Sequence, residues 1–452
     1  MRTWAEHEAA VATLRTSYAQ IPADQPVRLA KRTSNLFRPR VDTDVPGLDV
    51  SALDDVIAID THARTSDVQG MCTYERLVDE TLAHGFIPTV VPQLRTITLG
   101  GAVTGLGIES TSLRLGLPHE AVLEMDVLTG NGDFITATPE NEHAEFFNAF
   151  PNSYGSLGYA VRLRIKLEPA TTHVRLRHHF AGTPDKAIDV INEVAATGSF
   201  DGQRVDAIDG TAFAPSQIYL TLAEFTNEGG ATSDYTGQSI YYRSIAERSG
   251  DFLTMRDYLW RWDTDWFWCS RAFGAQHPIV RRFWPAAKRR SDVYHRMVAW
   301  DSRLGVSKIL DRFKGVPGRE KVIQDIEVPL ERLGDFLDWF DANVGMRPVW
   351  ICPLRTQQPW PTYPLKPGEV YVNLGFWGTV EVPADSPPGA VNRRIEAEVQ
   401  RLGGHKSLYS EAFYTREDFD QLYDTAGLDK LRAQYDPAQR LSSLYDKTVR
   451  NR

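Results

Sequence analysis

The chain has 452 residues, of which 42% are apolar and 24% are charged. Such a composition is typical of folded globular proteins, and the length predicts about two domains. Acidic residues outnumber basic ones, giving a formal net charge of −9, which disfavours a nucleic-acid partner. The cysteines, Cys72, Cys269 and Cys352, lie far apart in the chain, so neither a disulfide framework nor a metal site is expected.

The sequence also predicts where in the cell the protein is found. No apolar run approaches the roughly 20 residues that a membrane-spanning helix needs. The first residues, "MRTWAEHEAAVATL", also lack the uninterrupted hydrophobic stretch of a secretory signal. Scattered cysteines fit a reducing compartment. We therefore expect a cytoplasmic protein, and peripheral contact with the inner face of a membrane stays open.

The first elements predicted in chain order are a strand at 56–60 and a helix that begins after Thr73 and ends at Gly85. A hairpin is expected over 121–139, because an Asn-Gly pair in its centre suits a tight turn. A short helix at 142–150 follows. The segment 159–169 then alternates apolar and charged residues, which predicts a half-buried strand.

Beyond residue 170 the pattern changes, so we place a domain boundary there. Strands are expected in "SQIYLTLAEF", "KVIQDIEVPL", "PVWICPL" and "EVYVNLGFW", and helices at 184–198, 331–343 and 391–402. Their irregular alternation predicts an α+β domain around one antiparallel sheet.

The stretch "TLGGAVTGLGIESTS", residues 98–112, contains Gly100, Gly101, Gly105 and Gly107. Glycines let the backbone approach a bulky group, and amides in such a loop cradle anions such as a pyrophosphate. A pair of tight turns explains the glycines equally well. The stretch matches neither the dinucleotide fingerprint nor a P-loop, so a dinucleotide would bind by another geometry.

A family resemblance rests on several motifs in order. Pro92, the glycine stretch, "VLEMDVLTGNGDF" and "SYGSLGYAVRLRIKLEP" resemble the FAD-binding PCMH-type domain of the vanillyl-alcohol oxidase/p-cresol methylhydroxylase superfamily. Within it, "GLGIESTS", "PVWICPL", "LYSEAFYTREDF" and "LRAQYDP" are similar to the Δ24-sterol reductase branch and its bacterial relatives, which reduce 10-methylene fatty acyl chains to 10-methyl ones.

That resemblance implies three parts and one cofactor. A two-subdomain FAD-binding domain would span 1–170, an α+β substrate domain 171–405, and a C-terminal segment, 406–452, would return to the flavin. FAD would be non-covalent, because "SNLFRPR" offers no histidine where covalent relatives carry one.

The resemblance also assigns flavin contacts residue by residue. The pyrophosphate and ribityl chain would lie against Gly100, Gly101, Gly105, Gly107, Ile108, Ser110 and Ser112. Gly155, Gly158 and Val161 would lie near the adenine, and Pro92 beside the isoalloxazine. Ser34, Asn35 and Leu36 occupy the place of the family's first phosphate loop.

An aromatic cluster, "MRDYLWRWDTDWFWCSRAF", marks the second domain. Trp260, Trp262 and Trp266 cannot share one helical face, so we expect them, with Trp268, to line an apolar substrate cavity. Packing of the same side chains in a hydrophobic core is the alternative.

Catalytic residues are predicted from the late segment "GGHKSLYSEAFYT". Tyr409 and Glu411 fall where the sterol-reductase pattern has a tyrosine and an acid, which implies a proton donor, Tyr409, polarised by Glu411. A solvated carboxylate is the alternative for Glu411, and His277 and His405 are further candidate donors.

The function predicted is FAD-dependent reduction of a branched C=C bond in a 10-methylene acyl chain, with NADPH as electron donor. The resemblance implies a lipid substrate and an S-adenosylmethionine-dependent methyltransferase as partner. Three alternatives stay open: a Δ24-sterol reductase, a flavin oxidase or dehydrogenase of an alcohol or sugar, and a non-catalytic lipid-binding flavoprotein.

Overall fold

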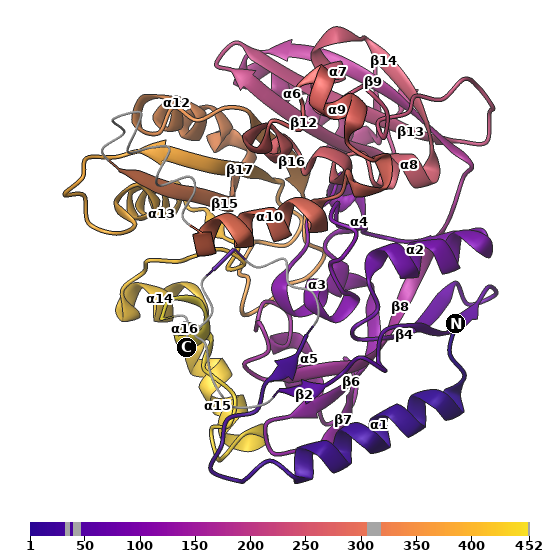
Figure 1. The fold of residues 1–452 in the computed structure, drawn as a ribbon, viewed down its shortest axis with the longest axis vertical. Coiled ribbons are helices and arrows are strands. Elements are labelled where there is room, and N and C mark those ends of the chain that lie inside the picture. Colours follow the sequence, from indigo (N-terminus) through magenta and orange to yellow (C-terminus); the bar gives the residue numbers. More distant parts are fainter. Residues whose placement is uncertain (32–36, 39–46, 305–317, 451–452) are drawn as a thin grey trace.

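Two β-sheets, one in each half of the molecule, organise the fold (Figure 1). The computed structural model describes residues 1–31, 37–38, 47–304 and 318–450. Ser34, Asn35 and Leu36, predicted to contact phosphate, lie outside the described residues. In the described ranges, no helix is both long and apolar enough to cross a membrane.

The first sheet is antiparallel, with strand order β3-β4-β8-β6-β7 and β5 paired to β8. Its strands are β3 (Val56–Asp60), β4 (Thr65–Gln69), β5 (Phe86–Pro88), β6 (Val122–Thr129), β7 (Phe134–Ala137) and β8 (Gly158–Pro169). The helices of this half are α1 (Trp4–Ala19), α2 (Tyr74–Ala83), α3 (Leu99–Gly105), α4 (Ser112–Leu115) and α5 (Ala144–Ala149). A short parallel pair, β1 (Leu29–Ala30) and β2 (Leu48–Asp49), lies beside it.

Local signals explain most of these elements. The Thr73 hydroxyl accepts a hydrogen bond from the Arg76 amide, which caps the start of α2 as predicted. The predicted hairpin is confirmed as β6 and β7, and Gly132 in its turn has φ of 91°, a conformation that favours glycine. The alternating segment is confirmed as β8, whose central position in the sheet explains its length.

The second sheet has eight antiparallel strands in the order β14-β9-β13-β12-β16-β17-β15-β18. They are β9 (His173–Gly182), β12 (Ala207–Ala214), β13 (Gln217–Thr226), β14 (Gly250–Thr254), β15 (Arg319–Pro329), β16 (Val349–Leu354), β17 (Tyr371–Glu381) and β18 (His405–Lys406). A small hairpin, β10 (Ser199–Phe200) and β11 (Gln203–Arg204), lies outside it. The predicted α+β class with an antiparallel sheet is confirmed.

The helices divide between the two faces of this sheet. A hydrophobic core under one face is built with α6 (Pro184–Thr197), α12 (Leu333–Asn343) and α13 (Ala390–Arg401). The segment that faces the first half carries α7 (Tyr241–Glu247), α8 (Met255–Leu259), α9 (Pro278–Phe283) and α10 (Ser291–Leu304). It packs into a core continuous with the first half.

The chain ends back on the first half. Helices α14 (Arg416–Leu422), α15 (Thr425–Tyr435) and α16 (Leu444–Thr448) run along its side in Figure 1. The Asn131 amide of the hairpin turn donates to the Tyr435 carbonyl oxygen at 2.8 Å, which fastens this segment to the first sheet.

Candidate functional site

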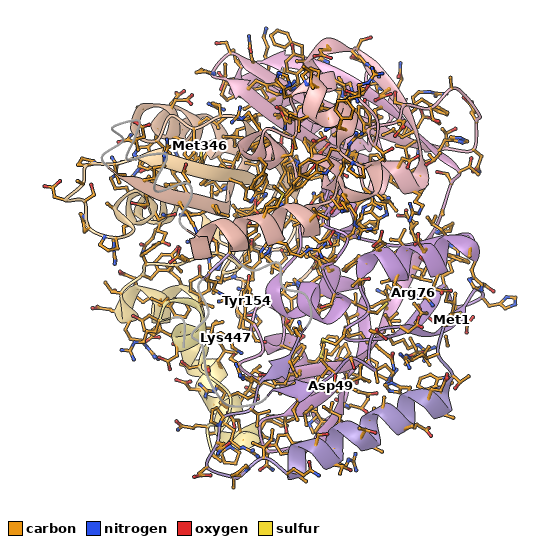
Figure 2. The ribbon with its side chains drawn as sticks, in the orientation of Figure 1. Met1, Asp49, Arg76, Tyr154, Met346 and Lys447 are labelled. Carbon is orange, nitrogen blue, oxygen red and sulfur yellow. The ribbon has the colours of Figure 1, made fainter. Side chains whose placement is uncertain are left out.

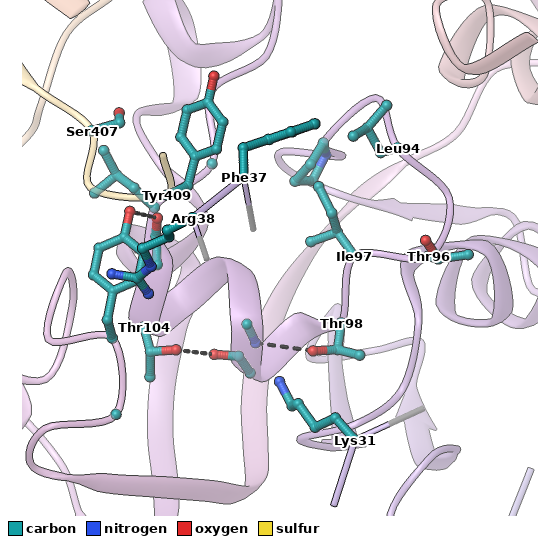
Figure 3. Close-up of a pocket in the computed structure, with 18 of the residues that line it drawn as sticks. Lys31, Phe37, Arg38, Leu94, Thr96, Ile97, Thr98, Thr104, Ser407 and Tyr409 are labelled. Carbon is teal, nitrogen blue, oxygen red and sulfur yellow. Dashed lines mark hydrogen bonds between the residues drawn. The ribbon is translucent and has the colours of Figure 1, made fainter. Parts of the chain in front are cut away.

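A cavity of about 610 Å³ lies where the two halves meet. The first half contributes wall residues from 26–31, 92–98, 100–108 and 154–160. The second half contributes residues from the aromatic segment and from strands β15, β16 and β17, and the C-terminal part adds Ser407, Tyr409, Ser442 and Lys447. Figure 3 shows part of this wall around α3. The cavity therefore combines a glycine-lined side with an aromatic side.

The glycine stretch begins as a helix and not as the tight turns we had left open. The Thr98 hydroxyl caps α3 by accepting from the Gly101 amide (Figure 3). A Cβ on Gly100 would lie 2.6 Å from the Gly70 carbonyl oxygen, so this glycine allows α3 to rest against the first sheet. A Cβ on Gly101 would lie 2.8 Å from the Thr98 hydroxyl that caps α3, and 4.0 Å from Lys31 Nζ on the cavity side.

The backbone amides of the stretch divide into two groups. Those of Leu99, Gly100 and Gly101 already donate to Cys72 O, Gly70 O and Thr98 Oγ1, so they do not face a ligand as the sequence suggested. The next free amides are those of Leu106, Gly107 and Ile108, on the cavity wall, which find no acceptor in the described part of the chain. Buried amides need acceptors, so a ligand oxygen suits this position.

A second unpaired donor lies beside Pro92. Pro92 and Gln93 both line the cavity, and Gln93 Nε2 is buried without a hydrogen-bond partner among the described residues. Sequence reasoning selected Pro92 and missed Gln93, because a single glutamine carries no local signal.

Basic side chains gather at the glycine-lined side. Lys31, Arg38 and Lys447 all line the cavity, and Lys447 Nζ donates to the Gly155 carbonyl oxygen at 3.2 Å. Figure 2 shows Lys447 beside Tyr154 of the neighbouring loop. Burial, together with the positive charges of Arg38, Arg432 and Lys31, lowers the pKa of Lys447 to about 7. A diphosphate would relieve this repulsion, so the donor set fits an anionic ligand.

Not every predicted flavin contact lies on the wall. Gly100, Gly101, Gly105, Gly107, Ile108, Gly155 and Gly158 do. Within the described residues, the wall includes neither the two serines nor Val161, a residue of β8 that is buried in a core shared with α1. The Ser110 hydroxyl donates to Glu109 Oε1 at 2.6 Å, and Ser112 Oγ accepts from the Glu109 amide. Both serines therefore bond within the stretch, and the Ser110 hydroxyl also bonds to the Tyr258 hydroxyl of the second half at 2.8 Å.

The aromatic side is built from two parts of the chain. Trp266 lines the cavity and stacks on Phe37, with ring centroids 5.4 Å apart, and Phe267 lies next to it. Trp350 of β16 and Trp377 of β17 complete this side, and sequence reasoning did not select either for the site.

The other predicted tryptophans lie behind the wall. Trp262 is buried, donates from Nε1 to Asp209 Oδ2 at 2.8 Å and stacks on Phe267. Trp260 and Trp268 are buried as well. The core packing we had named as the alternative therefore describes these three, and only Trp266 of the predicted set reaches the cavity among the described residues.

A phenol–carboxyl pair stands at the aromatic side. Tyr409 lines the cavity, accepts a hydrogen bond from Trp377 Nε1 at 2.8 Å and is hydrogen-bonded to Asp325 of β15. Burial raises the pKa of Asp325 to about 7, although hydrogen bonds from Asn373 and Tyr409 oppose that shift. Burial also raises the pKa of Tyr409 well above its ordinary value.

Glu411, which the sequence paired with Tyr409, has other charged neighbours in the structure. Burial raises the pKa of Glu411, but the charges around it are Lys321, Lys406 and Glu320. The Lys406 ammonium donates to the Glu411 carbonyl oxygen at 2.6 Å, and Glu411 is not among the described residues that line the cavity. Asp325 and Glu327, two acids that share one face of strand β15, were the signal that the sequence offered for an acid beside Tyr409.

The two histidines named as further candidates, His277 and His405, are not suited to donate a proton in the cavity. Burial lowers the pKa of His405 to about 3, which keeps this ring neutral, and His277 is exposed on the surface. Tyr409 and Asp325 are thus the acid–base groups that face the cavity from its aromatic side.

Comparison with known proteins indicates that the chain contains an FAD-binding domain. Residues 4–138 match the family model described as FAD binding domain. The chain is 24% identical to human Delta(24)-sterol reductase over 413 residues, covering 87% of this chain and 76% of that protein. A homolog from Caenorhabditis elegans is 23% identical, with 88% and 78% covered, and the Arabidopsis thaliana protein is 23% identical, with 73% and 59% covered.

These likenesses confirm the predicted FAD-binding domain, and the chain is an FAD-dependent oxidoreductase. The residues present fit that cofactor. Lys31, Arg38 and Lys447 would hold its diphosphate, with the amides at 106–108, and the aromatic side would border its isoalloxazine ring.

Replacing Gly101 by leucine is expected to abolish FAD binding, because the new side chain would occupy the space between α3 and Lys31. Flavin absorbance of the purified protein measures the result. Gly229→Leu is the matched control, since its Cβ position is open space and its φ is not positive. A Gly101→Leu protein that retains FAD at full stoichiometry would contradict the assignment.

Replacing Lys447 by methionine is expected to weaken FAD binding about ten-fold or more, because a buried charge-assisted contact is lost. Lys447 must gain a proton when the diphosphate binds, so wild-type affinity should fall as pH rises above about 7, and the variant should lose that slope. Lys430→Met, at an exposed lysine paired with Glu145, is the control for both measurements by fluorescence titration. Equal affinities would exclude Lys447 from the site.

Proposed function

We propose that the protein reduces an isolated, branched carbon–carbon double bond in a lipid. The observation that carries the proposal is the cavity, which joins a cationic, amide-lined side to an aromatic side with one phenol–carboxyl pair. Relatives named Delta(24)-sterol reductase, matched over most of the chain, support reduction as the reaction. The range of possible substrates narrows because the aromatic side is apolar.

The chemistry divides between cofactor and protein. Reduced FAD, when bound, supplies a hydride. The double bond gains that hydride at its more substituted carbon and a proton at the other, so positive charge grows at the branched carbon during the reaction. The faces of Trp266, Phe267 and Trp377 can stabilise such charge by about 0.5–2 kcal/mol each where water is excluded. Their packing keeps this part of the cavity dry.

Tyr409 and Asp325 supply the proton. The Trp377 indole donates to the Tyr409 oxygen, which fixes the phenol and leaves its proton directed along the bond to Asp325 or to a substrate carbon. Asp325, with a pKa of about 7, can carry a replacement proton at neutral pH. A tyrosine alone would be a poor donor, because burial raises its pKa.

The acceptor we favour is a 10-methylene acyl chain, with NADPH as the electron donor and a methyltransferase that supplies the methylene lipid. A long acyl chain suits an apolar cavity, and its branched methylene carbon is the position where positive charge would be stabilised. A sterol side chain is the second candidate, which the names of the relatives favour.

Anaerobic turnover tests the proposal. The FAD-loaded protein is mixed with NADPH and either a 10-methylene acyl phospholipid or a sterol with a branched side-chain double bond, and products are analysed by mass spectrometry. We expect the acyl chain to gain two hydrogens. Reduction of neither lipid, together with oxygen-dependent turnover of an alcohol or sugar, would contradict the proposal.

Tyr409→Phe and Asp325→Asn should retain FAD and lose product formation about 100-fold or more, as expected for loss of an acid–base group. Glu411→Gln is the matched variant and should remain active, because Glu411 faces Lys321 and Lys406. Single-turnover rates of the pre-reduced proteins measure the effect. Loss of activity in Glu411→Gln alone would restore the pairing inferred from the sequence.

The rate of lipid reduction should also fall as pH rises through about 7. The folded protein holds the Asp325 proton up to that pH, and above it the reserve proton is lost. Asp325→Asn should show a low rate without this inflection. A wild-type rate that is flat between about pH 6 and 8 would exclude Asp325 from proton supply.

A further inference from the structure

One segment leaves the cavity wall, reaches the molecular surface and comes back. It starts at Trp266, which lines the cavity. It ends at His295, whose ring lies 5.9 Å from that of Trp266 and 5.7 Å from that of Phe37. Helix α9 lies between these ends in the chain, so the segment that forms this surface also contributes Trp266 to the aromatic side of the cavity.

Helix α9 exposes apolar side chains. Ile279 is 64% exposed, Val280 40% and Phe283 79%. Ile279 and Val280 precede Phe283 by four and three residues, so all three lie on one face of the helix. The opposite side is fixed, because buried Arg281 binds Asp265 at 2.7 Å and the Gly237 carbonyl oxygen at 2.9 Å. A rigid helix thus holds an apolar face in water.

The charged side chains in the segment around this face are all basic. Between Trp266 and Ser291 the sequence has no aspartate or glutamate, in a chain whose net charge is −9. Arg271, Arg282 and Lys288 are exposed there, and none forms an ion pair with a carboxylate within the described residues. Arg289 and Arg281 point inward instead, to backbone carbonyls of the loop at 236–239.

We propose that Ile279, Val280 and Phe283, with Arg271, Arg282 and Lys288, form a docking surface for an anionic lipid bilayer. The apolar side chains enter the acyl region at the headgroup boundary, and the cations contact lipid phosphates. A second copy of the chain fits less well, because two such surfaces would place like charges against each other. This proposal rests on the proposed function: the substrate is a lipid, which would pass from the bilayer to the cavity beside Trp266.

Vesicle sedimentation tests this surface with the full, FAD-loaded chain. Wild-type protein should sediment with vesicles of phosphatidylglycerol and phosphatidylcholine, and not with phosphatidylcholine alone. Ile279→Ser/Phe283→Ser and Arg282→Glu/Lys288→Glu should each weaken binding at least ten-fold. Trp4→Ser is the control, because Trp4 is 46% exposed on α1 at the other end of the molecule (Figure 1) and should leave binding unchanged.

Flavin absorbance shows that each variant remains folded. The vesicles contain no reducible lipid, so binding and activity are separate results, and bilayer binding by a protein that reduces neither lipid would refute only the proposed function. Absence of wild-type binding to anionic vesicles would overturn the docking surface. Equal binding by Ile279→Ser/Phe283→Ser would also overturn it, as would a wild-type dimer in sedimentation equilibrium that this variant abolishes.

Discussion

The cavity depends on a buried charge cluster centred on Arg261. Its guanidinium lies 3.0 Å from Glu109 Oε1 and 3.0 Å from Asp209 Oδ2, and all three side chains are almost completely removed from water. Glu109 belongs to the glycine-rich stretch, Arg261 to the aromatic segment and Asp209 to β12. A buried charge without a partner costs several kcal/mol. The cluster therefore holds three walls of the cavity in one arrangement.

The same cluster orders the aromatic side. Asp209 Oδ2 also accepts from Trp262 Nε1 at 2.8 Å and from Trp350 Nε1 at 3.2 Å. Trp262 then stacks on Phe267, which packs on Trp377 with ring centroids 4.2 Å apart. An ionic interaction outside the cavity thus fixes apolar groups within it. Exclusion of water by those groups is the condition that raises the pKa of Asp325 and strengthens any contact with developing charge.

The two sides of the cavity need different groups, polar donors on one side and apolar surface on the other. A diphosphate needs cations and free amides, which the first half and the C-terminal helix α16 supply through Lys31, Lys447 and residues 106–108. An apolar substrate needs a dry surface, which the second half supplies. Because neither half contains both sets of groups, an oxidoreductase site forms only where they meet.

Much of the fold followed from local patterns. Helix α2 and the β6–β7 hairpin were predicted because a capping threonine and an Asn-Gly turn act within a few residues. Helix α3 was not predicted, because glycines have low helix propensity. It forms since Gly100 permits close contact with Gly70, a tertiary interaction that no local pattern reveals.

The sequence by itself identified the glycine-rich stretch and Tyr409, which both line the cavity, and the aromatic content of the second half, since these are properties of residue type and short-range order. Only the tertiary structure decided which groups face the cavity. Antiparallel pairing brings β15 against β17, and this register places Asp325 opposite Gly375, two residues from Trp377. Partners chosen by strand register are distant in the chain, so Asp325, and not nearby Glu411, pairs with Tyr409.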